Sequence, residues 1–249
     1  VLTSEDDASV LFGFTRSYFM VDVEPVAGAV YFIQSMMPHK RIDELYTILG
    51  RARQGKTERF RALHRHLTDC SDFFVHTVGD RGLVMLVFTL PSHDLVFKVI
   101  RDDFGHPKNI SHEDVKKKYK FVFTHDRAGR LIDTQEFRNI EFPINKFSPE
   151  LLSDLLESTS QTVRLDGEHV VIDHLYTERR LTPLNLFVRD RDYEQAKLAM
   201  LDYGQAIKDL AMTNIFPGDL LLKNFGVSRH GRVIFYDYDE LCLLTDCHF

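Results

Sequence analysis

The stretch Asp219-Leu-Leu-Leu-Lys-Asn224, followed thirteen residues after its end by Asp237, decides the fold of this chain. Between Asn224 and Asp237, two short apolar runs flank His230-Gly231, which predicts two strands joined by a tight turn. Such a hairpin folds Asp237 back toward Asn224. The sequence therefore predicts a site where carboxylate and amide oxygens meet, and these are ligands suited to Mg²⁺.

The same spacing is typical of the catalytic loop of protein kinases. In those enzymes a catalytic base lies five residues before an Asn that binds Mg²⁺, and a second metal-binding Asp follows across a short hairpin. Phosphoryl transfer requires mainly position and charge from the protein. The alternative is a chance combination of a loop acid, a turn Asn and a strand-end acid.

A lysine inside an apolar run supports the kinase interpretation. Residues 81–90 and 95–100 predict two strands with a tight connection, and Lys98 lies in the second. A lysine buried there needs an anion, which in kinases is nucleotide phosphate, steadied by a glutamate on a helix. Ser111 and the acids after it predict the start of such a helix, and Glu113 is our candidate for the glutamate. The alternative is a lysine on an exposed strand face.

Three further segments follow one another along the chain in the order expected for a kinase-like domain. Residues 77–83 precede the first strand and can cover the phosphates, and their Gly-x-x-Gly is shorter than the usual glycine-rich loop. After a predicted hairpin that turns at Asp166-Gly167, residues 177–181 predict the connection between two lobes, with backbone groups available to adenine. Residues 189–212 then have the periodicity of a helix.

Motifs spread along almost the whole chain point to one family. They include Asn214-Ile-Phe-Pro-Gly-Asp219, Lys223-Asn-Phe-Gly-Val, Tyr236-Asp-Tyr-Asp-Glu240, Tyr176-Thr-Glu-Arg-Arg, Ser35-Met-Met-Pro and Gln54-Gly-Lys-Thr. Together these motifs resemble bacterial isocitrate dehydrogenase kinase/phosphatase. The resemblance implies a bifunctional enzyme that phosphorylates a serine of isocitrate dehydrogenase with ATP and Mg²⁺, and removes the same phosphate at one nucleotide-dependent site.

The resemblance also assigns roles to residues of this sequence. It implies that Asp219 is the catalytic acid/base, that Asp239 serves the phosphatase direction and that Asp133 has a catalytic role. Asn224 and Asp237 match the metal-binding positions. The residues that match the nucleotide-binding positions are Thr77, Val78, Gly79, Asp80, Arg81, Gly82, Leu83 and Lys98. ADP is the second nucleotide, Mn²⁺ is an alternative to Mg²⁺, and small metabolites are expected effectors.

These observations predict an α+β, protein-kinase-like fold of two lobes, preceded by a helical regulatory segment. The N-lobe is expected to be an antiparallel sheet and the C-lobe mainly helical. Residues 1–72 are the expected C-terminal part of the regulatory domain, and residues 73–249 the expected kinase-like domain. Only twelve residues follow Asp237, so we expect this domain to be cut short after its metal-binding loop.

Composition limits the function classes. A net charge of -6 argues against a nucleic-acid partner. Cys70, Cys242 and Cys247 lack the pairing of a zinc site and suggest a reducing compartment. The apolar runs are much shorter than the ~20 residues that a membrane helix needs, and the start of the sequence does not resemble a signal peptide. We therefore expect a cytoplasmic protein without a membrane or nucleic-acid partner.

Two other functions remain open: a kinase-shaped scaffold that binds nucleotide without turnover, and a small-molecule kinase of the same fold. The joint presence of Lys98, Asp219, Asn224 and Asp237 favours an enzyme, because a scaffold need not keep all four. Residues 50–57 fit the phosphate-binding pattern Gly-x-x-x-x-Gly-Lys-Thr. The helical spacing before this stretch instead predicts a turn between two helices.

Overall fold

The computed structural model describes residues 21–79, 81–105, 110–125 and 129–247, and the chain divides into two compact units at Cys70 and Ser71. The first unit contains α2 (Val26–Met36), α3 (Ile42–Ile48) and α4 (Ala52–Asp69). Gly50 has a φ of +80° at the turn between α3 and α4, and α4 begins at Ala52. Residues 50–57 therefore form a turn and a helix start, as predicted.

The first unit is held by an apolar cluster and by a buried ion pair. Asp43, on α3, accepts a hydrogen bond at 3.0 Å from Nε of Arg59 on α4, and both side chains are almost fully buried. A Cβ at Gly55 would lie 2.3 Å from the Thr47 hydroxyl, so only glycine permits this close approach of the two helices.

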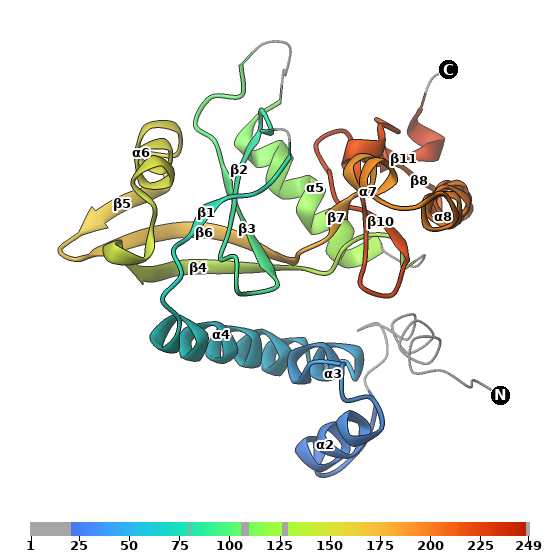
Figure 1. Ribbon diagram of the computed structural model, residues 1–249, viewed down its shortest axis with the longest axis horizontal. Helices are drawn as coiled ribbons and strands as arrows, with labels where there is room; N and C mark the ends of the chain where they lie inside the picture. Colours follow the sequence, from blue (N-terminus) through green and yellow to red (C-terminus); the bar gives the residue numbers. More distant parts are fainter. Residues whose placement is uncertain (1–20, 80, 106–109, 126–128, 248–249) are drawn as a thin grey trace. The chain divides into compact units, whose positions relative to one another are not determined.

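The second unit is built on an antiparallel sheet (Figure 1). Its order is β1-β2-β3-β6-β4, and β5 pairs with β6. The strands are β1 (Val75–His76), β2 (Met85–Thr89), β3 (Leu95–Ile100), β4 (Thr134–Pro143), β5 (Val163–Asp166) and β6 (His169–Arg179). Both predicted strands around the tight connection are confirmed as β2 and β3, as is the β5–β6 hairpin.

Apolar and aromatic side chains fix two helices on this sheet. The helix α5 (His112–His125) begins after Ser111, whose hydroxyl accepts a hydrogen bond from the Asp114 amide. Tyr119 of α5 stacks on Tyr176 of β6 with 3.9 Å between the ring centroids. The helix α6 (Pro149–Ser158) lies near β1, β2 and β5, close to η1 (Ile144–Lys146).

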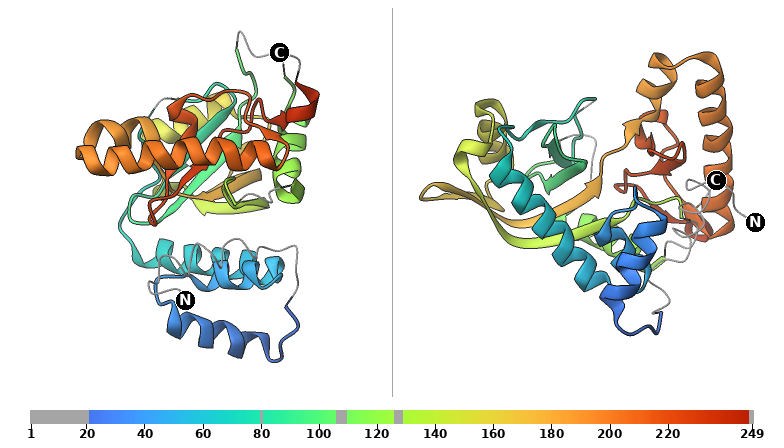
Figure 2. Two further views of the ribbon diagram at one scale, coloured as in Figure 1. Left: turned by 90° about the vertical axis from the view of Figure 1, so that its right-hand side faces the viewer. Right: turned by 60° about the horizontal axis from the view of Figure 1, so that its bottom comes forward.

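The rest of the second unit is mainly helical. It contains the helices α7 (Leu184–Asp190) and α8 (Tyr193–Met212), the short strands β7 (Thr182–Pro183), β8 (Ile215–Phe216), β9 (Phe225–Val227), β10 (Val233–Phe235) and β11 (Cys242–Leu243), and the turns η2 (Leu222–Asn224) and η3 (Leu244–Asp246). The predicted hairpin is confirmed as β9 and β10. It lies between α8 and the large sheet (Figure 2).

This arrangement confirms the predicted α+β, two-lobed kinase-like fold with a helical segment before it. One boundary differs from the prediction. Residues 177–179 belong to β6, because they pair with β3, so the connection to β7 is reduced to Arg180 and Leu181. In the part of the chain that the structure describes, we find no helix of the length and apolar character that a membrane crossing requires.

Candidate active site

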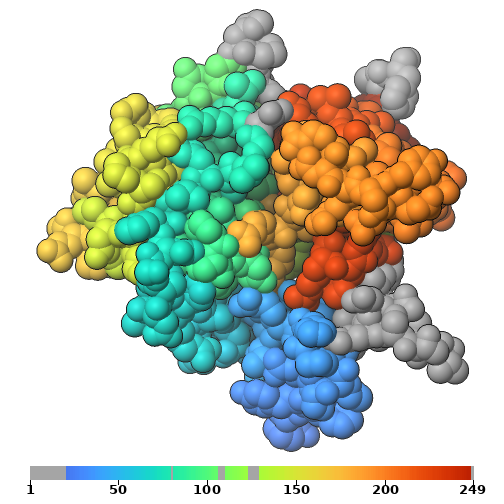
Figure 3. Space-filling view, viewed as in Figure 1, coloured from blue at the N-terminus to red at the C-terminus, as the bar shows by residue number. Residues whose placement is uncertain are grey.

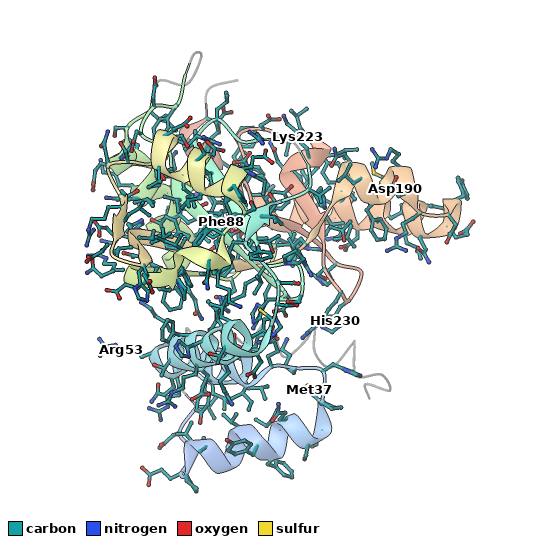
Figure 4. All side chains as sticks on the ribbon, turned by 60° about the vertical axis from the view of Figure 1, so that its left-hand side comes forward. Met37, Arg53, Phe88, Asp190, Lys223 and His230 are labelled. Atoms are coloured by element: carbon teal, nitrogen blue, oxygen red, sulfur yellow. The ribbon has the colours of Figure 1, made fainter. Side chains whose placement is uncertain are left out.

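A cavity of about 780 Å³ lies in the second unit between the sheet and the helical part. Its size is within the usual range for a small-molecule site. Figure 3 shows one face of the molecule, with the segment before β2 and the helices α7 and α8 on this face. Lys223, in the catalytic loop, and Asp190, at the end of α7, both line the cavity and are labelled in Figure 4.

Lys98 projects from β3 into this cavity and is only 6% exposed. Its Nζ lies 2.7 Å from Oε2 of Glu178 and donates a hydrogen bond of 2.9 Å to the carbonyl oxygen of Tyr236. Nζ also lies 5.4 Å from the Tyr236 ring centroid, a distance at which a cation interacts favourably with the ring. The lysine therefore connects the sheet directly to the segment that carries Asp237.

The structure corrects the predicted partner of Lys98. Glu113 lies in the first turn of α5 with an exposed side chain, whereas Glu178 of β6 forms the ion pair. The reason is the pairing of β3 with β6, which sets Lys98 opposite Tyr176 and Val96 opposite Glu178. Burial raises the pKa of Glu178, and Lys98 and the Thr134 hydroxyl oppose this rise.

The segment that we expected to cover the phosphates borders the cavity. Its described members Thr77, Val78, Gly79, Arg81, Gly82 and Leu83 all line it. Asp80 lies outside the described residues. Gly79 has a φ of +119°, a conformation that side chains with a Cβ rarely adopt. This glycine therefore lets the segment turn back over the cavity next to Pro183.

Asp219 lines the same cavity from the catalytic loop. Its Oδ1 accepts a hydrogen bond of 3.0 Å from the Leu221 amide, which fixes the start of the loop. The Tyr203 hydroxyl of α8 donates to the carbonyl oxygen of Leu220. At Gly218, where φ is +84°, a Cβ would lie 2.4 Å from Cβ of Glu240. The approach of the loop to the segment after the hairpin therefore requires glycine at residue 218.

The remaining predicted ligands also meet at this cavity, which Asn224, Asp237 and Asp239 all line. The backbone amide of Tyr236 donates to the carbonyl oxygen of Asn224 at 3.1 Å, so the hairpin does return Asp237 to Asn224. Asn224 is only 6% exposed. Within the described part of the chain, neither the Asn224 side chain nor the Asp237 carboxylate makes a hydrogen bond or an ion pair.

These residues fit a magnesium ion that a nucleotide also binds. Among the described residues there is no group of three or more His, Cys, Asp or Glu that could hold a metal ion. Mg²⁺ commonly uses one or two carboxylates and takes its other ligands from water and from phosphate. The Asn224 amide and the Asp237 carboxylate supply two such protein ligands, and substrate phosphates and water can supply the others.

Asp133 is placed differently from the other predicted residues. Ile132 lines the cavity, whereas Asp133, the residue before β4, does not. Neighbouring residues of an extended segment project to opposite sides, which accounts for the difference. The structure therefore brings the other described catalytic and metal-binding candidates together and leaves Asp133 outside the cavity lining.

Sequence reasoning missed two buried charged groups. Glu178 lies in a strand, and its signal was an acid near the end of the largely apolar β6 run, which also contains Asp173. Arg130, before β4, is 1% exposed and pairs with Asp202 and Asp209 of α8. Glu178 lies within the quoted stretch Tyr176-Thr-Glu-Arg-Arg, but only the pairing of distant segments identifies the partners of either residue.

An antiparallel sheet with a buried lysine, joined to a helical part that carries a catalytic-loop Asp, an Asn and a hairpin Asp, defines a protein-kinase-like domain. Residues 72–249 match the model of the isocitrate dehydrogenase kinase/phosphatase (AceK) kinase domain, and residues 1–71 match the model of its regulatory domain. The chain therefore belongs to the isocitrate dehydrogenase kinase/phosphatase family.

Curated relatives support this assignment over the whole chain. Proteins named isocitrate dehydrogenase kinase/phosphatase are 53% identical in Anaeromyxobacter sp. strain Fw109-5 and 55% identical in Anaeromyxobacter dehalogenans strain 2CP-C, each over 100% of this chain. The chain spans 43% and 42% of the length of these two curated relatives. Among solved structures, the ROP18 kinase domain in complex with AMP-PNP and sucrose has a TM-score of 0.39 and 13% identity, covering 74% of this chain and 61% of that chain.

Proposed function

We propose that this chain carries the nucleotide site of a bifunctional enzyme that phosphorylates a serine of isocitrate dehydrogenase with ATP and removes the same phosphate. One observation carries the proposal: Lys98, Asp219, Asn224, Asp237 and Asp239 all line one cavity. The names of the relatives supply the protein substrate. The kinase-like domain implies ATP as the phosphoryl donor and ADP as its product.

Each residue has a role that follows from its chemistry. Lys98 binds nucleotide phosphate with its ammonium group, and the segment from Thr77 to Leu83 covers the phosphates. Asn224 and Asp237 hold Mg²⁺, with Mn²⁺ as an alternative. The metal, when bound, neutralises the charge that develops on the phosphate oxygens.

Asp219 orients the serine hydroxyl and accepts its proton while the γ-phosphoryl group moves from ATP to the serine oxygen, leaving ADP. In the phosphatase direction, Asp239 orients a water molecule for attack on the phosphorus of the phosphoserine, the bond to the serine oxygen breaks, and the products are inorganic phosphate and the free serine hydroxyl. In an extended segment, residues two apart project to the same side, and both Asp237 and Asp239 line the cavity. Asp133 lies outside the cavity lining, so we assign it no step.

The proposal also includes the cellular compartment, the division into domains and the effectors. Cys70, Cys242 and Cys247, all within the described residues, form no disulfide, which suits a reducing compartment, and we therefore place the activity in the cytoplasm. We propose that residues 1–72 belong to a regulatory domain and residues 73–249 to a catalytic domain. Small-metabolite effectors remain an expectation from the family resemblance.

The test assays both directions with the full-length protein, purified isocitrate dehydrogenase, labelled ATP and Mg²⁺. We expect Asp219→Ala to lower kinase turnover at least about 10²-fold with ATP affinity largely unchanged, because a general base acts in the chemical step. Asp239→Ala should lower phosphatase turnover far more than kinase turnover. Nucleotide binding without labelling of any protein would instead indicate a scaffold, and labelling of a small molecule would indicate a small-molecule kinase.

A further inference from the structure

We propose that Glu178 is the residue that positions Lys98 for nucleotide phosphate, so that the sheet itself holds the lysine and α5 does not. This inference rests on the proposed function, because it assumes that the cavity binds nucleotide. It assigns to a strand the positioning role that a mobile helix glutamate has in protein kinases.

The strand register places the two side chains together. β3 and β6 are antiparallel neighbours, with Lys98 opposite Tyr176 and Val96 opposite Glu178. Lys98 and Glu178 are therefore diagonal neighbours on one face of the sheet, a separation that long side chains can span. Both line the cavity, and their charged atoms lie 2.7 Å apart.

Glu178 is itself held from the other side of its strand. Thr134 of β4 is opposite Glu178 in the register, and its hydroxyl donates to Oε1 of Glu178 at 3.0 Å. One carboxylate oxygen therefore binds Thr134 and the other binds Lys98. Since Glu178 is 1% exposed, water cannot replace either partner. The carboxylate has one position, and it fixes the position of the lysine.

Lys98 retains a hydrogen-bond donor for a ligand. An ammonium group has three donors, and within the described residues Lys98 uses two of them, one on Glu178 and one on the Tyr236 carbonyl oxygen. The third donor is available in the cavity. Because the same lysine also binds the Tyr236 carbonyl oxygen, it sets the position of a bound phosphate relative to the segment that carries Asp237.

The helix α5 contacts the site through other groups. Tyr119 stacks on Tyr176, and Nζ of Lys118 donates to the carbonyl oxygen of Leu241. Neither contact supplies a carboxylate to Lys98, and Glu113 is exposed. In protein kinases, the position of the corresponding helix controls the lysine–glutamate pair. Here a movement of α5 leaves the pair intact, because both of its members belong to hydrogen-bonded strands.

The experiment compares ATP with adenosine, which has the same base and ribose but no phosphate. In Glu178→Gln of the full-length protein, we expect the Kd for ATP to rise at least about 10-fold while the Kd for adenosine changes less than about twofold. The KM for ATP in the labelling of isocitrate dehydrogenase should rise in parallel. A residue that only maintained the fold would affect both ligands equally.

Two variants serve as comparisons. Glu136→Gln removes a carboxylate from β4, two residues from Thr134, and Glu136 does not line the cavity. It should bind both ligands as the unaltered protein does. Glu113→Gln tests the rival helix glutamate, and a selective loss of ATP binding in this variant, with none in Glu178→Gln, would overturn the proposal.

The remaining outcomes are also decisive. If Glu178→Gln lacks a cooperative melting transition, Thr134→Val takes its place, because it removes only the hydroxyl that holds the second oxygen of Glu178. An unchanged ratio of the ATP and adenosine Kd values in that folded variant would overturn the proposal. If the unaltered protein fails to bind ATP, the proposed function fails. If it binds ATP and Glu178→Gln binds it equally well, only the positioning role fails.

Discussion

Two buried cations in the second unit are surrounded very differently. Arg130 donates at 2.7 and 2.8 Å to the two oxygens of Asp202, at 2.7 Å to Asp209 and at 3.0 Å to the Val233 carbonyl oxygen. Lys98 meets one carboxylate and one carbonyl oxygen, and it lines a cavity. An arginine has five donors, and the fold uses four of those on Arg130. The comparison therefore separates a cation that maintains the fold from one that can bind a ligand.

The Arg130 cluster joins three segments that are distant in the sequence. It connects the segment before β4 to α8 and to β10, and Oδ2 of Asp202 also accepts a hydrogen bond of 2.6 Å from the Val233 amide. The hairpin that follows Asn224 and precedes Asp237 is thereby fixed to α8. Arg130 thus supports the segment that carries Asp237 without lining the cavity.

The largest expected effect belongs to Arg130→Met. Removing the arginine leaves Asp202 and Asp209 without their shared cation, so we expect the free energy of unfolding to fall by about 3–5 kcal/mol. Urea denaturation followed by circular dichroism measures this change. The molecules that remain folded should bind ATP with unchanged affinity. A denaturation midpoint equal to that of the unaltered protein would show that the Arg130 cluster does not stabilise the fold.

Lys98→Met should change activity more than stability. It removes a donor to phosphate, so we expect kcat/KM for ATP to fall about 10²–10³-fold, which corresponds to ~2.7–4 kcal/mol of transition-state stabilisation. Steady-state labelling of isocitrate dehydrogenase in both directions measures this loss. The double variant Lys98→Met/Glu178→Gln also removes the unpaired carboxylate, so it should melt closer to the unaltered protein. Recovery of activity in that double variant would contradict a direct role for Lys98.

The same contrast explains what the sequence could predict. The hairpin after Asn224 follows from local signals, namely two short apolar runs around His230-Gly231, and Lys98 follows from a charge in an apolar strand. Glu178 could not be paired with Lys98 from the sequence, because their contact depends on the register of β3 and β6, which are about 80 residues apart along the chain. The glutamate of α5 was the nearer candidate, yet helix position depends on packing by Tyr119.

Arg130 and Gly218 were beyond prediction for the same physical reason. Arg130 acquires its three anchoring partners only when α8 and β10 come together. Gly218 is required by the distance of its Cβ position from Glu240, which lies across the hairpin. Local patterns therefore predicted which residues line the cavity, and tertiary contacts decided which residues hold them in place.

The smallest expected effect concerns a third charged cluster, which is centred on a carboxylate and not on a cation. Asp154 of α6 is 20% exposed, and its oxygens lie 2.9 Å from Nε2 of His76 and 3.2 Å from a guanidinium nitrogen of Arg101. Burial alone would raise the pKa of Asp154, but hydrogen bonds from His76, Arg101 and Ser158 lower it to about 2.

Because this pKa is depressed below the ~3.9 of an unfolded chain, Asp154 stabilises the fold above about pH 4, and the contribution is lost as the pH falls toward about 2. We expect Asp154→Asn to lower the free energy of unfolding at pH 7 by about 1–2 kcal/mol after allowance for solvent screening. In urea titrations, the difference from the unaltered protein should begin to shrink near about pH 4 and become small toward about pH 2. A difference that is independent of pH would mean that Asp154 acts by packing or by neutral hydrogen bonding, and the contrast with the Arg130 cluster, which is centred on a buried cation, would then lose its electrostatic basis.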